Sequence, residues 1–420
     1  MGSKGIPSRG GTERVVEALA TRQAVRHRVV VVGSLATCAS GDYRGVHVVS
    51  LPVPSGKYLR PLALQMLSAV WVLQSDCDVV NVHGMENAFI TPLMLLRCPV
   101  VVTSHGRAYR VQKWGAVAKL AMRASEWIAM RTATRVTAVS APQAQNLTRR
   151  YRRSVDPIPN GVTVADDADE SGARVLLSSV GLEGGRYWLF AAARVDPIKG
   201  CHTLIEAWRA VPGAPPLLVV GDLWHASGYE ERLRRLAEGT AVHFLPKVDS
   251  PTLLAGLLRL AELFVFPSTT EAMSMMLLEA LMSGTPVVAS DIPENVAILP
   301  ESVTTFRNGD ATDLREKLVT FAGRDRDETR RLAREAAQEV EARFDWGNIA
   351  LAYEQEYQRA MRARWRSSGS AQSADYPGAP PRSALGSARP AANVRLDSPP
   401  PAKHGVASVA NVWGLLSREQ

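Results

Sequence analysis

Two carboxylates, Glu271 and Glu279, flank seven residues directly after a short apolar segment of the chain. Residues 263–266 read Leu-Phe-Val-Phe and predict a buried strand, which places Glu271 in the loop at its carboxyl end. Glu279 falls about one and a half turns into the helix predicted over 274–282. Carboxylates accept hydrogen bonds from hydroxyl groups, and the helix N-terminus between them favours a phosphate. The pair therefore indicates a polyhydroxylated, phosphate-bearing ligand, although two isolated glutamates would be interpreted as solvated side chains.

Two cations, Arg194 and Lys199, stand five residues apart after the strand predicted over 187–191. Basic side chains on such a loop can clamp a diphosphate, and an arginine can make forked contacts with it. Taken alone, both would be interpreted as surface charge. Residues 55–58, Ser-Gly-Lys-Tyr, lack the upstream glycine and the Ser/Thr of a nucleotide-binding P-loop. No GxGxxG opens a βα unit in the sequence either, which argues against a dehydrogenase.

Glycines and histidines supply two weaker signals. Gly10 and Gly11 follow Arg9 and precede a helix predicted over 12–21, and paired glycines let the backbone approach an anionic group. His83 and His105 each follow a valine-rich strand and each precede a glycine. One such histidine would be interpreted as an ordinary loop residue, but two in equivalent positions favour a site at the strand ends.

Short Val-rich segments alternate with longer amphipathic ones, which predicts an α/β fold built of βαβ units with parallel sheets. The expected strands are 27–32, 46–51, 79–82, 100–102 and 136–139, and then 187–191, 216–220, 242–245, 263–266, 286–289 and 303–306. The expected helices are 12–21, 62–74, 111–134 and 141–151, and then 201–210, 229–238, 251–260, 274–282, 311–322, 326–343 and 346–366.

This pattern divides the chain into two α/β halves of similar size. We expect an N-terminal domain over 1–165, a linker with a short helix over 166–184 and a second domain over 185–345. The helix over 346–366 is expected to cross back to the first domain. Residues 367–420 begin with a Ser, Ala, Pro and Gly-rich stretch that cannot bury enough apolar surface to order itself, so we expect a disordered tail.

Charge is unevenly distributed along the 420 residues, whose net charge is +8. Residues 1–165 carry a net +13 and residues 166–366 a net −7, so one half is suited to an anionic partner. Residues 107–135 interleave seven basic side chains with Trp114 and Trp127. Such a helix can lie on an anionic membrane surface. The alternative is a solvated helix whose tryptophans belong to the core. No nucleic-acid recognition motif accompanies the charge, so nucleic acid is not an expected partner.

Taken together, these motifs resemble the retaining glycosyltransferases of family 4, which have the GT-B fold of two facing Rossmann-like domains with a cleft between them. The resemblance runs from about Gly5 to Ala360 and rests on the order of the motifs. They are Ile-Pro-Asn-Gly-Val at 158–162, the segment 194–200, Val-Val-Gly-Asp at 219–222, the Glu271/Glu279 pair and Gly-Thr-Pro-Val-Val-Ala-Ser-Asp at 284–291.

The resemblance implies a transfer of a sugar from a nucleotide-diphosphate donor to a glycan or polyprenyl-linked acceptor, as in bacterial cell-envelope polysaccharide assembly. It assigns Arg194 and Lys199 to the donor diphosphate, Glu279 to the ribose, Glu271 to the transferred sugar and His105 to a hydrogen bond with that sugar. Backbone amides at 273–275 (Met273, Ser274, Met275) and the glycines Gly10 and Gly11 would line the donor site. Arg9 and His83 would lie on the acceptor side.

The same resemblance implies front-face substitution without a protein nucleophile, without a cofactor and without a metal. Arg194, Lys199 and helix N-termini would take over the role of a divalent ion. Asp-x-Asp occurs at 76–78 and at 325–327, and we interpret both as chance. Other possibilities remain open: another GT-B enzyme such as a nucleotide-sugar epimerase, or an inactive pseudo-glycosyltransferase that acts as an interaction subunit.

The sequence departs from the family at its start, where an apolar strand usually precedes the Gly-rich loop. That central strand is absent from the expected elements, which leaves two interpretations open: the true start of the chain lies upstream of Met1, or the N-terminal sheet is incomplete. No segment is apolar enough to span a membrane, no signal peptide opens the chain, and its four cysteines are widely spaced. We therefore expect a cytoplasmic protein, with peripheral association at the inner face of the cell membrane.

Overall fold

The computed structural model describes residues 5–7, 10–56, 59–110, 114–163, 167–182, 186–223 and 228–367. Residues 1–369 form one compact unit, and its described part contains two α/β lobes with separate hydrophobic cores. The expected tail at 367–420 lies almost wholly outside the described residues. The alternation of strands and helices that the sequence predicts is confirmed in both lobes.

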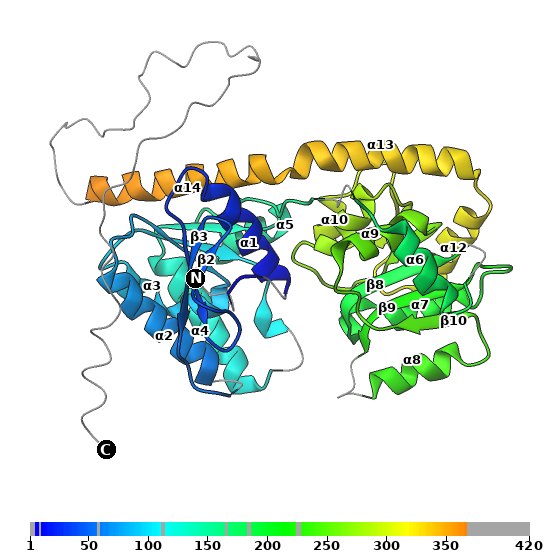
Figure 1. Ribbon diagram of the computed structural model, residues 1–420, viewed down its shortest axis with the longest axis horizontal. Helices are drawn as coiled ribbons and strands as arrows, with labels where there is room; N and C mark the ends of the chain where they lie inside the picture. The colour runs from blue at the N-terminus through cyan, green and yellow to red at the C-terminus, as the bar shows by residue number, and fades with distance from the viewer. Residues whose placement is uncertain are drawn as a thin grey trace, which may run out of the picture. The chain divides into compact units, whose positions relative to one another are not determined.

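The N-terminal lobe, drawn in blue to cyan in Figure 1, carries two sheets. The first has the strand order β1-β3-β2 and the second the order β4-β5-β6-β7. The strands are β1 (Val30–Ser34), β2 (Gly41–Tyr43), β3 (Val46–Leu51), β4 (Val80–His83), β5 (Val100–Ser104), β6 (Arg135–Ala138) and β7 (Asp156–Pro157). Among the described residues no strand joins β1 to β4, so the strands of this lobe form two separate sheets.

The helical elements of the N-terminal lobe connect these strands. They are α1 (Gly11–Gln23), α2 (Leu59–Gln74), η1 (Met85–Ile90), α3 (Thr91–Met94), η2 (Ala108–Arg110), α4 (Ala116–Thr132) and α5 (Ala141–Tyr151). Strand β5 is buried along its whole length, because Val-Val-Val-Thr-Ser is apolar on both faces of the pleat at its first three positions. The buried strand fixes its carboxyl end, where His105 follows.

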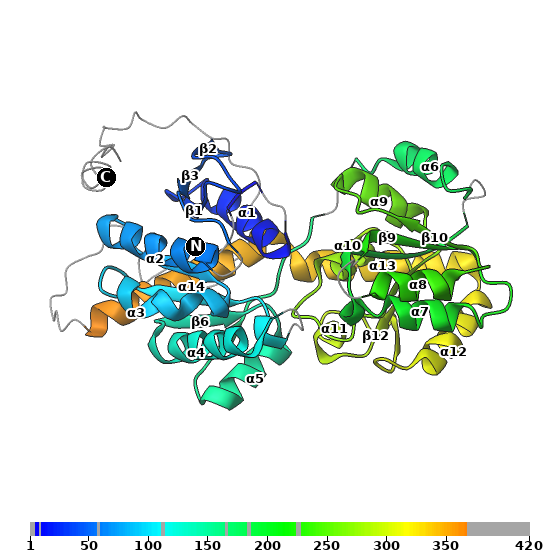
Figure 2. The same ribbon diagram turned by 90° about the horizontal axis from the view of Figure 1, so that it is seen from below.

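The second lobe is built on one parallel sheet with the order β10-β9-β8-β11-β12-β13. Its strands are β8 (Trp188–Val195), β9 (Leu217–Leu223), β10 (Val242–Leu245), β11 (Leu263–Phe266), β12 (Val287–Ser290) and β13 (Thr304–Phe306). Helices cover both faces of this sheet, as Figure 2 shows. One face packs against α6 (Glu170–Ser178), α9 (Pro251–Leu260), α10 (Met275–Met282) and α13 (Arg326–Phe344). The other packs against α7 (Cys201–Trp208), α8 (Tyr229–Ala237) and α12 (Ala311–Ala322).

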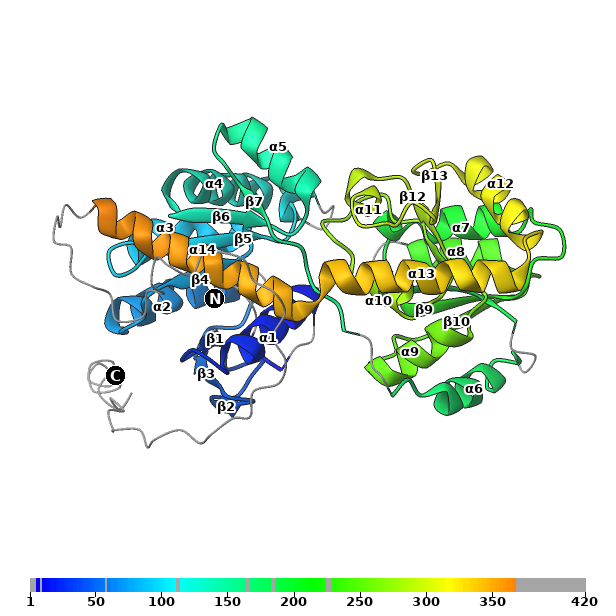
Figure 3. The same ribbon diagram turned by 90° about the horizontal axis from the view of Figure 1, so that it is seen from above.

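Helix α14 (Trp346–Ser367) follows α13 and packs on the N-terminal lobe against α1, β5 and β6 (Figure 3). Trp346 and Tyr353 are buried in a cluster with Val15 and Ile158. Farther along, Asn81 Nδ2 donates a hydrogen bond of 2.9 Å to the Tyr357 hydroxyl. The last helix therefore returns from the second lobe to the N-terminal lobe, where apolar contacts and a part-buried hydrogen bond hold it.

Helix α4 is shorter than the predicted helix over 111–134, of which residues 111–113 lie outside the described part. Trp127 is 52% exposed, with Arg131 stacked on its ring at 5.4 Å, so the interpretation of that tryptophan as a core residue is wrong. Val117 and Leu120, on the same side of the helix, are also exposed. None of the described helices is both long and apolar enough to cross a membrane.

Candidate active site

Lys199 and Glu271 are in direct contact. The Lys199 ammonium donates a hydrogen bond of 2.6 Å to Glu271 Oε1, and the two side chains are 25% and 11% exposed. A charge-assisted contact of this length in a partly dry position is among the stronger polar interactions in a protein. The structure therefore joins one of the two predicted diphosphate-binding cations to one of the two predicted sugar-binding carboxylates.

Sheet topology explains this contact. Strands β8 and β11 are parallel neighbours, so the loops at their carboxyl ends leave the same edge of the sheet. The two loops are also hydrogen-bonded to each other, because Thr269 N donates to Ile198 O at 2.8 Å. Gly200 ends the first loop with a φ of +70°, and a Cβ there would lie 2.0 Å from the Pro267 carbonyl oxygen. Only glycine lets the Lys199 loop approach the Glu271 loop this closely.

Arg194 lies in β8 itself, because that strand extends to Val195, beyond the predicted end at Ala191. A shift in register against β9 occurs between Ala191 and Arg194. Asp196 follows, with its Oδ1 atom buried. Burial raises the pKa of the Asp196 carboxyl, while the positive charges of Lys199 and Arg194 act in the opposite direction. Both cations therefore lie close enough to Asp196 to act on the same carboxylate.

Glu279 lies in α10, about one turn from the first residue of the helix, Met275. Ser274 caps this helix, because its hydroxyl accepts a hydrogen bond of 3.2 Å from Leu277 N. The first amides of a helix have no acceptor within the helix, so they are available to a ligand anion. The Glu279 carboxylate forms an ion pair with Arg14 of α1, in the other lobe. No contact joins Glu279 to Glu271 in the described structure.

Sequence reasoning missed Arg14. The sequence did contain an indication, because a cation in the first turn of a helix is disfavoured by the helix dipole and is stabilised by a carboxylate from another element. Arg14 stands in that turn of α1 and finds Glu279. The amino end of α1, with Gly10 as its N-cap and Gly11 as its first residue, is thereby brought to α10. Arg9 lies outside the described residues.

The side chains of Met273 and Met275 have structural contacts of their own. Met273 is buried, and its sulfur accepts a hydrogen bond of 3.0 Å from Asn160 N at the junction of the two lobes. Met275 packs against the apolar cluster that α1 and α14 share. Packing thus occupies both side chains, and the assignment of the backbone amides to the donor site stays a prediction.

His83 and His105 stand at the ends of the paired strands β4 and β5. His83 Nδ1 lies 2.8 Å from His105 Nε2, and the rings stack with 5.1 Å between their centroids. Burial lowers the pKa of His105 to about 4, and burial together with His105 lowers the pKa of His83 well below its usual range. Both imidazoles are neutral at pH 7, so one ring donates the shared hydrogen bond and the other accepts it.

The His105 loop lies against the Glu271 loop. Gly106, directly after His105, has a φ of +113°, and a Cβ built on it would lie 3.1 Å from the Cβ of Ala272. The histidine pair and the Lys199–Glu271 pair are thus carried by loops in contact, one from each lobe. Groups of three or more His, Cys, Asp or Glu side chains that could hold a metal ion do not occur among the described residues. This site therefore offers two neutral imidazoles that can form hydrogen bonds, two cations and two carboxylates.

Comparison with known protein families agrees with this arrangement. The family described as Glycosyltransferase Family 4 matches residues 9–166, and the family described as Glycosyl transferases group 1 matches residues 186–324. The first match covers most of the N-terminal lobe, with His83 and His105. The second covers most of the other lobe, with the Lys199–Glu271 pair and Glu279.

Two curated relatives show how far the likeness extends. A phosphatidyl-myo-inositol mannosyltransferase of Mycobacterium leprae is 29% identical over 81% of this chain and 91% of that protein. A D-inositol 3-phosphate glycosyltransferase of Nocardia farcinica is also 29% identical, over 54% of this chain. The chain spans 53% of the length of the Nocardia relative.

Solved structures share the fold at lower identity. The sucrose-phosphate synthase of Thermosynechococcus elongatus matches with a TM-score of 0.71 at 20% identity, over 84% of this chain and 94% of that one. The Anabaena protein HepE in complex with UDP-glucose matches with a TM-score of 0.67 at 19% identity, over 84% and 97%. Fold, motif order and family matches agree: this chain belongs to the group 1, family 4 glycosyltransferases, enzymes with the GT-B fold of two Rossmann-like domains.

Proposed function

We propose that this enzyme is a retaining, metal-independent glycosyltransferase that moves a sugar from a nucleotide-diphosphate donor to a glycan or lipid-linked acceptor. The observation that carries the proposal is the Lys199–Glu271 contact. A cation for the diphosphate and a carboxylate for the sugar hydroxyls are held side by side, which is what a nucleotide sugar requires at the bond that breaks.

In the proposed reaction an acceptor oxygen forms a bond to the anomeric carbon on the face from which the diphosphate departs. The bond between that carbon and the phosphate oxygen breaks, and the acceptor proton passes to the departing phosphate. Arg194 and Lys199 stabilise the negative charge that develops there. Neutral His105 offers a hydrogen bond to the sugar, and Glu279 accepts the ribose hydroxyls. Ribose binding requires the ion pair between Glu279 and Arg14 to open or to be shared.

The test is a donor screen that measures the nucleotide released from a panel of uridine, guanosine and adenosine diphosphate sugars. Lys199→Ala and Glu271→Ala are expected to abolish turnover without unfolding the protein. The anomeric configuration of the product, determined by NMR, must equal that of the donor, and turnover must persist in excess chelator. Inversion of the anomeric centre or dependence on a divalent ion would refute the corresponding part of the proposal.

A lipid-linked acceptor and a peripheral position at the inner face of the cell membrane form part of the same proposal. Phosphatidyl-myo-inositol, named for the Mycobacterium relative, is a lipid, which supports such an acceptor. Apolar side chains of α2 and α4 are exposed in the most basic part of the chain, and they are Leu59, Leu62, Met66, Leu67, Val70, Val117, Leu120 and Trp127. Apolar side chains beside basic ones are typical of interfacial helices. Sedimentation with anionic vesicles at low salt tests this, since a protein that stays in the supernatant has no such affinity.

One observation favours a second candidate, an inactive pseudo-glycosyltransferase that serves as an interaction subunit. The N-terminal sheet is interrupted between β1 and β4 in the described structure, and an unpaired edge invites a partner strand. The donor screen separates the two candidates. Nucleotide release by the wild type that Lys199→Ala abolishes supports the enzyme, and a wild type without release from any donor supports the subunit.

A further inference from the structure

Two thiols of the N-terminal lobe lie side by side at the amino ends of neighbouring strands. Cys77 shortly precedes β4 and Cys98 shortly precedes β5, and these strands pair in parallel. The two sulfur atoms are 3.3 Å apart. The loops that carry them are also joined, because Arg97 Nε donates a hydrogen bond of 2.6 Å to the Ser75 carbonyl oxygen. A disulfide has about 2.05 Å between its sulfur atoms, so this pair needs to close by little more than about 1 Å.

The surroundings of the two thiols make them unequal. Cys77 is half-buried and Cys98 is buried, so a small oxidant in solution reaches Cys77 first. A hydrogen bond from the Cys98 thiol outweighs burial and lowers the pKa of Cys77 to about 6. The Ser75 hydroxyl, 3.2 Å from Cys77 Sγ, and the charge of Arg97 act in the same direction. The hydrogen bond and burial both raise the pKa of Cys98, so at pH 7 Cys77 is the thiolate and Cys98 the thiol that donates to it.

A thiolate beside a protonated thiol can react with a peroxide in two steps. The Cys77 thiolate attacks one oxygen of hydrogen peroxide, the O–O bond breaks, and the departing hydroxide takes a proton from solvent and leaves as water. Cys77 is then a sulfenic acid. The Cys98 sulfur gives up its proton and attacks the Cys77 sulfur, the S–S bond forms, and the S–O bond breaks with release of a second water. The dithiol loses two electrons, and the peroxide gains them.

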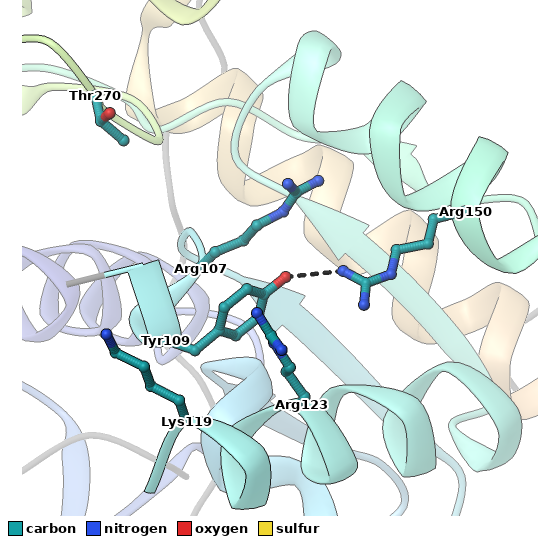
Figure 4. A pocket seen from close by; sticks show the side chains of 6 residues that line it. All are labelled: Arg107, Tyr109, Lys119, Arg123, Arg150 and Thr270. Atoms are coloured by element: carbon teal, nitrogen blue, oxygen red, sulfur yellow. Dashed lines mark hydrogen bonds between the residues drawn. The ribbon is translucent and has the colours of Figure 1, made fainter. Parts of the chain in front are cut away.

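The dithiol lies apart from the groups that the proposed function assigns to the substrates. His83 and His105 stand at the carboxyl ends of β4 and β5, whereas the two cysteines precede the amino ends of the same strands. The basic pocket of about 550 Å³ in this lobe, shown in Figure 4, is lined in the described structure by four cations together with Tyr109 and Thr270, and by neither cysteine. An oxidant therefore reaches Cys77 without passing through this pocket.

A bond between the two sulfur atoms would constrain the part of the lobe that leads to His83. Residues 77–98 include β4, η1 and α3, and β4 ends at His83. A cross-link between the ends of such a segment restricts the unfolded chain more than the folded one, which raises stability. Because the sulfur atoms are already in contact, we expect the disulfide to stabilise the lobe without rearranging its strands.

We propose that Cys77 and Cys98 form an oxidation site, at which a peroxide converts the two thiols into an intramolecular disulfide and a thiol reductant restores them. Cys77 is the attacking residue, and Cys98 resolves its sulfenic acid. The site is independent of the proposed sugar transfer, because it uses no residue assigned to the donor or the acceptor.

The test treats the reduced full-length protein with hydrogen peroxide at pH 7 and follows its four thiols by mass spectrometry of peptides. A cross-link between the peptides of Cys77 and Cys98, with loss of two hydrogen atoms, identifies the disulfide, and dithiothreitol should remove it. Cys77→Ser and Cys98→Ser each delete one partner, and dimedone traps any sulfenic acid that remains. The matched control is Cys38→Ser, which removes another buried thiol of the same lobe.

The wild type and Cys38→Ser are expected to form the cross-link, with Cys77 reacting about tenfold or more faster than buried Cys201. Cys98→Ser should instead accumulate a sulfenic acid on Cys77, and Cys77→Ser should leave Cys98 unmodified. Oxidation should raise the Tm of the wild type by several degrees and leave that of both pair variants unchanged. A wild type without the cross-link, or one in which Cys77 reacts no faster than Cys201, overturns the proposal. Oxidation of Cys98 at the wild-type rate in Cys77→Ser overturns it as well.

Discussion

Replacement of Lys199 by methionine separates the structural role of this residue from its proposed role in catalysis. Lys199→Met keeps most of the side-chain length but removes the charge that holds Glu271 at 2.6 Å. The Glu271 side chain, 11% exposed, is then left without its counter-ion. Leaving a buried polar group unpaired lowers the free energy of unfolding by roughly 1–3 kcal/mol, which lowers Tm by several degrees for a lobe of this size. Loss of a preorganised cation at the departing phosphate raises the activation free energy by about 2.7–4 kcal/mol, which lowers kcat roughly 10²–10³-fold.

A double-mutant cycle with Glu271→Gln distinguishes these two effects. In Lys199→Met/Glu271→Gln the unpaired carboxylate is gone, so the free energy of unfolding should recover toward the wild-type value. Turnover should remain as low as in the worse single variant, because neither the cation nor the carboxylate is present. The measurements are urea unfolding and nucleotide release, with Arg315→Met, an exposed position on α12, as the control. Lys199→Met with kcat within about threefold of the wild type would refute the assignment of this residue to the diphosphate.

Three further predictions concern packing, pH and thiol reactivity. Gly161→Ala should lower the free energy of unfolding by about 1–3 kcal/mol, because its Cβ would lie 2.4 Å from a ring atom of Trp346. Acidification from about pH 7.5 to 5.5 should lower the free energy of unfolding of the wild type by about 1.4 kcal/mol more than that of His105→Asn. The reason is that His105, with a pKa of about 4, takes up no proton in this range when folded, whereas the unfolded histidine does. Cys77 should be alkylated by iodoacetamide with a midpoint near pH 6, because a hydrogen bond from Cys98 lowers its pKa to about 6.

Each of these has an internal control. Gly115→Ala should be nearly neutral, because nothing lies within 4 Å of the added Cβ. For the histidine, equal pH dependence of unfolding in the wild type and in His105→Asn contradicts the lowered pKa. For the thiols, burial raises the pKa of Cys201, so mass spectrometry should find it unmodified at a pH where Cys77 has reacted. Modification of both at the same rate would show that Cys77 is not activated.

Most of the fold could be predicted from hydropathy alone. Strand β11, Leu-Phe-Val-Phe, is apolar at every position and is buried at every position. Local periodicity was less informative where an element depends on its partner. Strand β8 runs four residues beyond its predicted end, because its pairing with β9 resumes at Arg194 after a shift in register. The short strand β2 was not predicted, since Gly-Asp-Tyr has no apolar pattern and pairs only because β3 lies beside it.

The candidate site was predictable by residue type but not by contact. Motif order and the family resemblance predict Arg194, Lys199, Glu271, Glu279 and His105 as site residues without any coordinates. The sequence did not indicate that Arg14 reaches Glu279, because these residues are 265 positions apart. It also described the four cysteines as widely spaced, whereas the fold brings the sulfur atoms of Cys77 and Cys98 to 3.3 Å from each other.

Composition and periodicity by themselves determined the α/β class, the two lobes, the basic character of the N-terminal one and the residue types available for chemistry. These properties follow from local backbone preference and from how apolar side chains are spaced along the chain. The tertiary structure alone decided that Lys199 meets Glu271, that His83 shares a hydrogen bond with His105 and that four cations share one pocket. Such contacts join residues brought together by sheet order and helix packing, which short stretches of sequence do not encode.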